Sequence, residues 1–276
     1  MMTKEKRKPQ KRWLLPVLFL VLTAAGTALS PPRQPASWTI QTMEAFLQKA
    51  AVVRIERDVE LGRTLPWRVT LRQGRTEGRA FFKYGHRSSP PPLRNSYKYE
   101  LAAYALNRFL NLEIVPPVVE RTIDKTPGAL QWYLENCRSE RDRERIKLEP
   151  PDLDAFLRRL DIVQVFEALV HDECGDKDDT LIHKDTWKIC RVDFSEAFPA
   201  VETLPPGGLI QRCSRDLYDR LKRMKRNDLA DLLRPYLETG ELGALLARKD
   251  KILELLDARI REKGEKAVLF ADPNGR

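Results

Sequence analysis

The sequence lacks the cysteine pattern of a zinc site and the charge excess of a nucleic-acid-binding protein. Its four cysteines are scattered and form no Cys-x-x-Cys pair, so a zinc site has no support. The formal net charge of +9 includes +5 from the first thirteen residues, where six basic side chains stand against Glu5. The rest of the chain therefore carries only +4, and we expect no nucleic-acid partner.

Charged residues are also missing from Trp13 to Leu29, directly behind the basic head. A positive region followed by an apolar run predicts a secretory signal peptide or a signal anchor over residues 1–30. The run is short for a membrane helix, which needs roughly 20 residues, so cleavage near Gly26-Thr27-Ala28 stays open. The run has no cysteine, which excludes a lipoprotein anchor. With the basic end in the cytoplasm, the body is expected across the membrane, either anchored or secreted.

An exported body would permit disulfides, so the four cysteines have two interpretations. They form one or two disulfides, or they are buried free thiols. The sequence does not choose between them.

The remainder predicts a short linker over 31–38, a mixed front lobe over 39–136 and a mostly helical rear lobe over 137–276. In the front lobe, apolar spacing predicts a helix over 40–53 and a second helix over 96–110. Alternating segments predict two antiparallel hairpins, over 66–84 and 118–134. In the rear lobe, helices are expected over 154–170 and 214–263, with two short strands near 181–192. The fold class is therefore α+β.

Lys83 ends a strand-like run, and Glu100, seventeen residues later, opens a helix-like run. Kinase-type folds place a phosphate-binding lysine and the carboxylate that holds it in this order and on these element types. Taken singly, each residue has an ordinary interpretation: a solvated strand-end lysine, and an acid favoured by the helix dipole. The pair together favours phosphate chemistry.

Two further segments are candidates for holding a nucleotide. Gly62 and Thr64 precede the first hairpin, where a loop would arch over phosphates through its backbone N–H groups. Trp132 lies where the chain passes between the lobes, so the backbone there is a candidate partner for adenine. A plain turn and an ordinary core aromatic are the alternatives.

An acidic loop follows the long helix of the rear lobe. Five carboxylates fall within eight residues, and they repel one another unless a cation lies among them: Asp172, Glu173, Asp176, Asp178 and Asp179. Mg²⁺ or Ca²⁺ would relieve that repulsion, and a solvent-exposed turn is the alternative. Because a predicted hairpin would fold Asp193 back toward Asp179, these two residues are the expected metal pair.

Several of these motifs together resemble atypical protein-kinase-like proteins related to the HipA-type and phosphatidylinositol-kinase-type folds. The resemblance spans roughly 55–270 and includes Arg-Ala-Phe-Phe-Lys at 79–83 and Asp-Phe-Ser-Glu-Ala-Phe at 193–198. The other matching segments are 62–71, 99–104 and 115–121. The resemblance implies a two-lobed kinase-like fold that uses ATP and Mg²⁺. It implies that Lys83 binds phosphate, that Glu100 pairs with Lys83, and that Asp193 holds the metal.

The catalytic loop departs from the family pattern, which has an aspartate and then an asparagine five positions on. Asp179 stands at the asparagine position, and Cys174 stands five residues before it. A thiol cannot orient the attacking hydroxyl, so Asp172, Glu173 or Asp176 would have to replace the carboxylate through an insertion. The sequence thus predicts a phosphotransferase for an unknown protein or small-molecule hydroxyl. The alternative is an inactive pseudokinase that binds a nucleotide or metal as an interaction module.

Overall fold

The computed structural model describes residues 38–57, 65–86, 95–173, 175–206 and 210–272. The predicted N-terminal segment 1–30, Gly62 and Thr64 lie outside these described residues. Within the described ranges, no helix combines the length and apolar character needed to cross a membrane.

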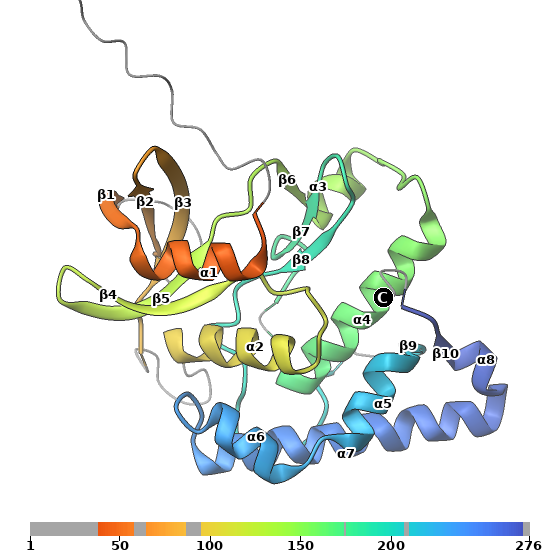
Figure 1. Ribbon diagram of the computed structural model, residues 1–276. Coiled ribbons are helices and arrows are strands. Elements are labelled where there is room, and N and C mark those ends of the chain that lie inside the picture. Colours follow the sequence, from red (N-terminus) through yellow and green to blue (C-terminus); the bar gives the residue numbers. More distant parts are fainter. Residues whose placement is uncertain (1–37, 58–64, 87–94, 174, 207–209, 273–276) are drawn as a thin grey trace, which may run out of the picture. The chain divides into compact units, whose positions relative to one another are not determined.

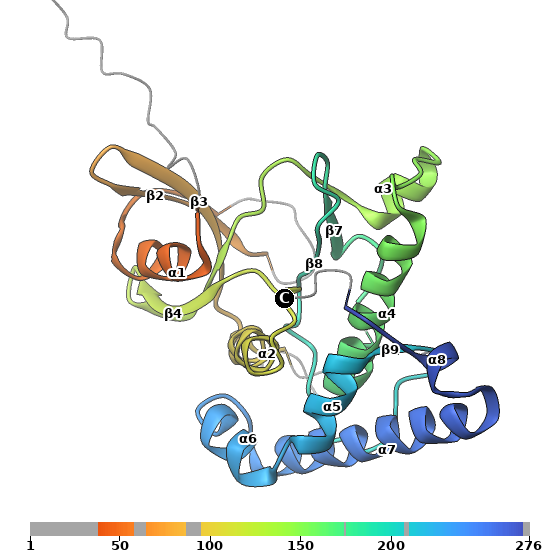
Figure 2. The same cartoon turned by 45° about the vertical axis from the view of Figure 1, so that its right-hand side comes forward.

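The front lobe is built on a five-stranded antiparallel sheet with the order β1-β2-β3-β5-β4. One helix, α1, lies against a face of this sheet, and α2 lies between the sheet and the rear-lobe helix α6 (Figures 1 and 2). The front-lobe elements are α1 (Ile40–Lys49), β1 (Ala51–Glu56), β2 (Trp67–Gln73), β3 (Thr76–Lys83), α2 (Tyr97–Phe109), β4 (Val118–Ile123) and β5 (Thr126–Trp132).

Because side chains alternate along a strand, the two faces of this sheet carry different residues. Phe82 and Leu130 are buried in a core that α1 closes with Phe46 and Leu47. Lys83, the neighbour of Phe82, belongs to the opposite face. Lys83 therefore points away from the α1 core and toward the rear lobe.

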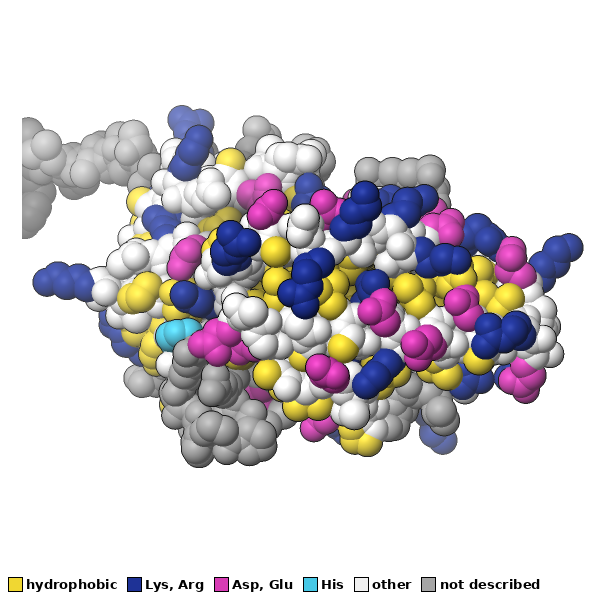
Figure 3. Space-filling view, turned by 90° about the horizontal axis from the view of Figure 1, so that it is seen from below, with side chains coloured by type: hydrophobic (Ala, Val, Ile, Leu, Met, Phe, Trp, Pro, Cys, Tyr) yellow, Lys and Arg dark blue, Asp and Glu magenta, His cyan; other side chains and the backbone are white. Residues whose placement is uncertain are grey.

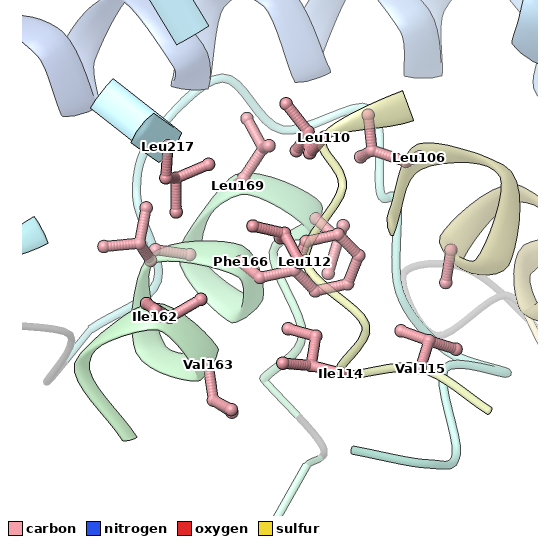
Figure 4. Packing of buried hydrophobic residues seen from close by; sticks show 14 of the residues in the cluster. Leu106, Leu110, Leu112, Ile114, Val115, Ile162, Val163, Phe166, Leu169 and Leu217 are labelled. Carbon is pink, nitrogen blue, oxygen red and sulfur yellow. The ribbon is translucent and has the colours of Figure 1, made fainter. Parts of the chain in front are cut away.

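The rear lobe surrounds the 18-residue helix α4, which contacts α7 and β9. Figure 4 shows Ile162, Phe166 and Leu169 of α4 packed against Leu110 and Leu112 from the end of α2. The rear-lobe elements are β6 (Cys137–Ser139), α3 (Glu140–Arg145), α4 (Leu153–Val170), β7 (Thr180–His183), β8 (Ile189–Arg191), β9 (Cys213–Ser214), α5 (Arg215–Arg223), α6 (Arg226–Leu233), α7 (Thr239–Lys263), α8 (Glu265–Val268) and β10 (Leu269–Phe270).

One predicted element is wrong in its length. The helix expected over 40–53 ends at Lys49, and β1 begins at Ala51. Ala50 has the extended dihedral angles that turn the chain. The β-branched residues Val52 and Ile55 then pair with β2, where their stiff side chains suit a strand better than a helix.

Charges on the outer surface are mixed. Figure 3 shows basic and acidic side chains interspersed with apolar ones on the face seen from below. Among the described cysteines, Cys137, Cys190 and Cys213 are free thiols, and the last two are buried. For these three residues, the structure agrees with the free-thiol interpretation.

Candidate active site

Three separate elements bring Lys83, Glu100 and Asp193 together. Lys83 is the last residue of β3, Glu100 lies in the first turn of α2, and Asp193 follows β8. Lys83 Nζ donates to Glu100 Oε1 at 2.6 Å and to Asp193 Oδ1 at 2.8 Å. We call these three residues the Lys83 cluster. Its lysine and glutamate were paired from the sequence alone, and the structure adds the aspartate to the same cation.

Local structure explains how α2 presents its glutamate. Ser96 caps the helix by accepting a hydrogen bond from the Lys98 backbone N–H at 3.1 Å. The Ser96 backbone N–H donates to the Ser195 carbonyl at 2.7 Å, which attaches the helix start to the segment after Asp193. The start of α2 and the Asp-Phe-Ser segment are therefore held in register.

The electrostatics of the Lys83 cluster favour charged lysine and charged aspartate. Burial opposes the charge of Lys83, but Asp193 and Glu100 together raise its pKa above the ordinary value. The ammonium of Lys83 lowers the pKa of Asp193 to about 2, although burial acts against it. Burial raises the pKa of Glu100, and Lys83 only partly offsets that effect. Asp193 is therefore the firmly ionised carboxylate of the cluster.

Asp193 also has an uncommon backbone conformation. Its φ of 65° lies in the left-handed region, which non-glycine residues seldom occupy. Ser195 Oγ donates to Asp193 Oδ1 at 3.0 Å and so helps to hold the side chain. Its side chain keeps 37% exposure, so a ligand or water can reach it. Strained and accessible residues of this kind often occur at functional sites.

A second cluster supplies the cation that the acidic loop requires. Arg191, at the end of β8, is fully buried and donates to Glu167 at 2.6 Å and to Asp172 at 2.7 Å. Its guanidinium lies 3.7 Å from Asp179 and also bonds the Val192 carbonyl. We call Arg191, Glu167, Asp172 and Asp179 the Arg191 cluster. In this structure, a side chain of the protein relieves part of the carboxylate repulsion for which the sequence suggested a metal.

The predicted catalytic carboxylates are each bonded to a protein group. The side chain of Asp172 is 1% exposed, and burial raises its pKa to about 7 although Arg191 opposes this. Glu173 lies 2.6 Å from His171 Nε2. Asp176 is on the surface and accepts from Arg141 at 3.0 Å. The structure gathers the three in one loop but orients them toward three different partners.

The expected metal pair lies on neighbouring segments. The Val192 backbone N–H donates to the Asp179 carbonyl at 3.0 Å, so the residue before Asp193 is hydrogen-bonded to Asp179. Burial raises the pKa of Asp179 while Arg191 opposes this, and the charge of Asp193 adds a smaller upward effect. In the described part of the chain, no group of three or more His, Cys, Asp or Glu residues is arranged to hold a metal ion. Metal binding by these two carboxylates stays a prediction.

Trp132 lies at the end of β5, but its side chain belongs to the α1 face of the sheet. Its ring contacts Trp38 at 4.7 Å and Phe46 at 6.0 Å between centroids. Its backbone N–H donates to the Pro117 carbonyl at 2.8 Å. Trp132 therefore packs as a core aromatic, and pairing of its backbone with a nucleotide stays a prediction.

Sequence reasoning missed Arg191, the residue that organises the acidic loop. The available signal was an arginine in the otherwise apolar run Ile189-Cys190-Arg191-Val192, close to five carboxylates. Buried arginine requires a partner, so such a position predicts an ion pair. The pattern does not say which carboxylates the arginine meets.

Comparison with solved structures identifies the class of fold. Hydra Fam20, solved with a sugar, aligns with a TM-score of 0.64 and 16% identity, covering 84% of this chain and 92% of that one. The Helicobacter pylori proinflammatory kinase CtkA aligns with a TM-score of 0.52 and 12% identity, covering 76% of this chain and 96% of that one. The chain therefore has a two-lobed, kinase-like α+β fold. No protein-family model matches the sequence, and a search of curated proteins gives no match.

Proposed function

We propose that this protein is a phosphotransferase that binds ATP with Mg²⁺ and transfers phosphate to a hydroxyl group. The observation that carries the proposal is the Lys83 cluster, in which one buried ammonium bonds a helix carboxylate and an ionised aspartate. Phosphoryl transfer depends mainly on positioned cations and needs little covalent help from the protein. A kinase-like fold is the scaffold on which this arrangement would act.

The side chains fit the groups that the proposal requires. Lys83 would hold phosphate oxygens, and Glu100 would keep its ammonium in place. Asp193, ionised and partly exposed, would hold Mg²⁺ with Asp179 as the second oxygen donor, because Mg²⁺ prefers carboxylates together with phosphate oxygens and water. When bound, the metal would neutralise charge on the phosphates. Gly62 and Thr64, which precede β2 in the sequence, would contribute backbone groups.

The acceptor and the location of the protein are part of the same proposal. The hydra Fam20 structure contains a sugar, so a sugar hydroxyl is a suitable acceptor to test beside protein hydroxyls. A closer relation to the HipA-type and phosphatidylinositol-kinase-type folds is also proposed. The basic, then apolar N-terminal segment favours a body on the extracytoplasmic side of a membrane.

One observation favours a second candidate, the inactive pseudokinase. Asp172, Glu173 and Asp176 each bond a protein cation or histidine. A cationic partner stabilises the charged form of a carboxylate and so makes it a weaker base toward a substrate hydroxyl. The inactive candidate keeps the Lys83 cluster for binding and transfers no phosphate.

Two measurements on the full chain in detergent test the proposal. The first follows thermal unfolding during titration with ATP and Mg²⁺, since saturation at 100 times Kd stabilises by about 2.7 kcal/mol. We expect Lys83→Ala and Asp193→Ala to abolish the shift. The second follows transfer of labelled γ-phosphate to sugars and to a serine-rich protein, with Asp193→Ala as the control.

The outcomes separate the candidates. A nucleotide shift with transfer that requires Asp193 supports the enzyme. A shift without transfer supports the pseudokinase. If millimolar ATP and Mg²⁺ give no shift in the wild type, both candidates are rejected.

A further inference from the structure

The side-chain Nε2 of Gln131, buried in the front lobe, has no hydrogen-bond partner among the residues that the structure describes. Gln131, in β5, is 3% exposed, and its Nε2 is buried without an acceptor. Buried polar groups are nearly always hydrogen-bonded, because an unpaired amide loses its water without compensation. The roles assigned above to the Lys83 cluster and the Arg191 cluster do not account for Gln131.

The strand register places this amide on the face of the sheet that carries Lys83. Gln131 lies directly opposite Phe81 of β3, and Lys83 is two residues further along the same strand. Residues opposite one another in an antiparallel pair, and residues two apart in a strand, point to the same side. Tyr133 is two residues after Gln131, and its ring contacts Phe81 at 5.2 Å, as that alternation requires.

The position also lies at the passage between the lobes. β5 ends one residue after Gln131, and the chain continues to β6 of the rear lobe. The neighbours Leu130 and Trp132 point to the opposite face, toward α1. Gln131 is therefore the last buried polar side chain of β5 on the Lys83 side.

A carboxamide has a donor and an acceptor side by side. Adenine offers the complementary pair along one edge, an N6 amine next to the acceptor N7, and glutamine pairs with it through two hydrogen bonds. Guanine has two acceptors, N7 and O6, at the same edge and satisfies only the NH₂ group of the amide. An unpaired glutamine thus distinguishes between the two purines.

We propose that Gln131 is a specificity-determining residue that pairs with the edge of an adenine base and selects adenine over guanine nucleotides. This inference rests on the proposed nucleotide-binding function. The amide and the ammonium of Lys83 share one face of the sheet, so a single ligand would meet the amide with its base and the ammonium with its phosphates. Binding would supply the partner that the amide lacks in the free protein.

Titration of the full chain in detergent with ATP and with GTP, each with Mg²⁺, tests the inference by thermal unfolding. The variants are Gln131→Met, which keeps the shape but removes the amide, and Gln131→Glu, which keeps only acceptors. Gln73→Met, at an exposed position in β2, is the matched control. We expect the wild type and the control to prefer ATP, and Gln131→Met to bind ATP about fivefold to tenfold more weakly with little change for GTP.

Unfolding of the free protein by urea gives a second readout. If the amide is hydrogen-bonded only when a ligand is bound, Gln131→Met removes an unpaired amide from the free protein. The free variant should then be as stable as the wild type or more stable. A clear loss of stability would mean that the amide has a structural role, and this would overturn the inference.

The ligand titrations distinguish this inference from the proposed function. Equal ATP and GTP affinities in the wild type, or an unchanged ATP to GTP ratio in Gln131→Met, overturn the inference and leave nucleotide binding intact. Absence of any nucleotide shift in the wild type overturns both.

Discussion

The Lys83 cluster and the Arg191 cluster each place one buried cation among carboxylates, but water reaches them to different extents. Asp193 of the Lys83 cluster is 37% exposed at its side chain, whereas Arg191 and Asp172 are at most 1% exposed. The first cluster therefore has a carboxylate bonded to its cation that a ligand can reach. The second is closed at Arg191 and Asp172, and only its Glu167 and Asp179 side chains are partly exposed, at 29% and 24%. Removal of one partner from a buried ion pair leaves an uncompensated charge, so Arg191 and Asp172 depend on one another.

Their connections to the chain differ as well. The Lys83 cluster joins a strand end, a helix start and a loop that lie far apart in the sequence. The Arg191 cluster joins the end of α4 to the loop that follows it and to β8. We infer that Arg191, with Glu167 and Asp172, holds the acidic loop in shape, and that the Lys83 cluster, together with Asp179, binds the ligand.

Substitution of Arg191, the fully buried cation, should have the largest effect on stability. Arg191→Met leaves Asp172 and Glu167 without their partner, and breaking a buried ion pair in this way costs about 3–5 kcal/mol. Urea unfolding measures the loss. Arg141→Met is the matched control, since Arg141 bonds two carboxylates of the same loop on the exposed surface and should change stability little. Equal effects of the two substitutions would contradict the comparison.

A second carboxylate change should rescue part of that loss. In Arg191→Met with Asp172→Asn, the buried charge that lacked a partner is gone, so the double variant should be more stable than Arg191→Met alone. A double variant that is less stable than Arg191→Met would show that the unpaired charge of Asp172 does not cause the loss of stability.

Lys83, whose partner Asp193 is partly exposed, should matter less for stability than Arg191 and more for ligand binding. Lys83→Met should cost about 2 kcal/mol, less than Arg191→Met, because Asp193 is partly exposed and can be hydrated, whereas Asp172 is buried. It should also abolish the ATP-dependent thermal shift, which is measured in the same samples. A Lys83→Met protein that keeps the shift would show that phosphate binds elsewhere.

A glycine beside Arg191 gives a steric test of the closed cluster. A Cβ on Gly175 would lie 1.7 Å from Arg191 Nη2 and 2.6 Å from Asp172 Oδ2. Gly175→Ala should therefore cost about 1–3 kcal/mol in urea unfolding, as overpacking does. Gly243→Ala is the control, because a Cβ there would meet no described atom within 4 Å apart from its chain neighbours and the backbone of its own helix. Alanine should favour helix α7 by up to about 1 kcal/mol. A harmless Gly175→Ala would mean that the loop moves away from Arg191 easily.

The pH dependence of stability should have opposite signs in the two clusters, and per pH unit it should be the smallest effect, at most about 1.4 kcal/mol for one carboxyl group. The folded-state pKa of Asp172, about 7, is raised from 3.8, so its contribution to stability decreases as pH rises between about 4 and 7. The folded-state pKa of Asp193, about 2, is lowered, so its contribution is present above about 3.8 and is lost as pH falls toward 2. Unfolding free energies of wild type, Asp172→Asn and Asp193→Asn from pH 2.5 to 7.5 would show the two slopes. If the free energy of unfolding changed with pH in the same way in Asp172→Asn and Asp193→Asn, the two clusters would not differ in the sign of their pH dependence.

Local patterns predicted most of the elements that deliver the Lys83 cluster. The alternation that ends at Lys83 and the Ser96 cap before Glu100 are features of short segments, so the sequence shows them without any knowledge of the fold. The wrong helix boundary near residue 50 also arises because only a short segment was considered. Residues 50–53 fit a helix by apolar spacing, and only pairing with β2 decides that they form a strand.

The sequence by itself determined the two-lobed order of elements, the lysine and glutamate at their ends, and the density of carboxylates after α4. Only the tertiary structure decided that Arg191 enters that acidic loop, that Trp132 turns to the α1 core, and that Gln131 is buried without a partner. The physical reason is the range of the interactions. Caps and alternation act between neighbouring residues, whereas burial and ion pairing depend on which distant segments the folded chain brings into contact.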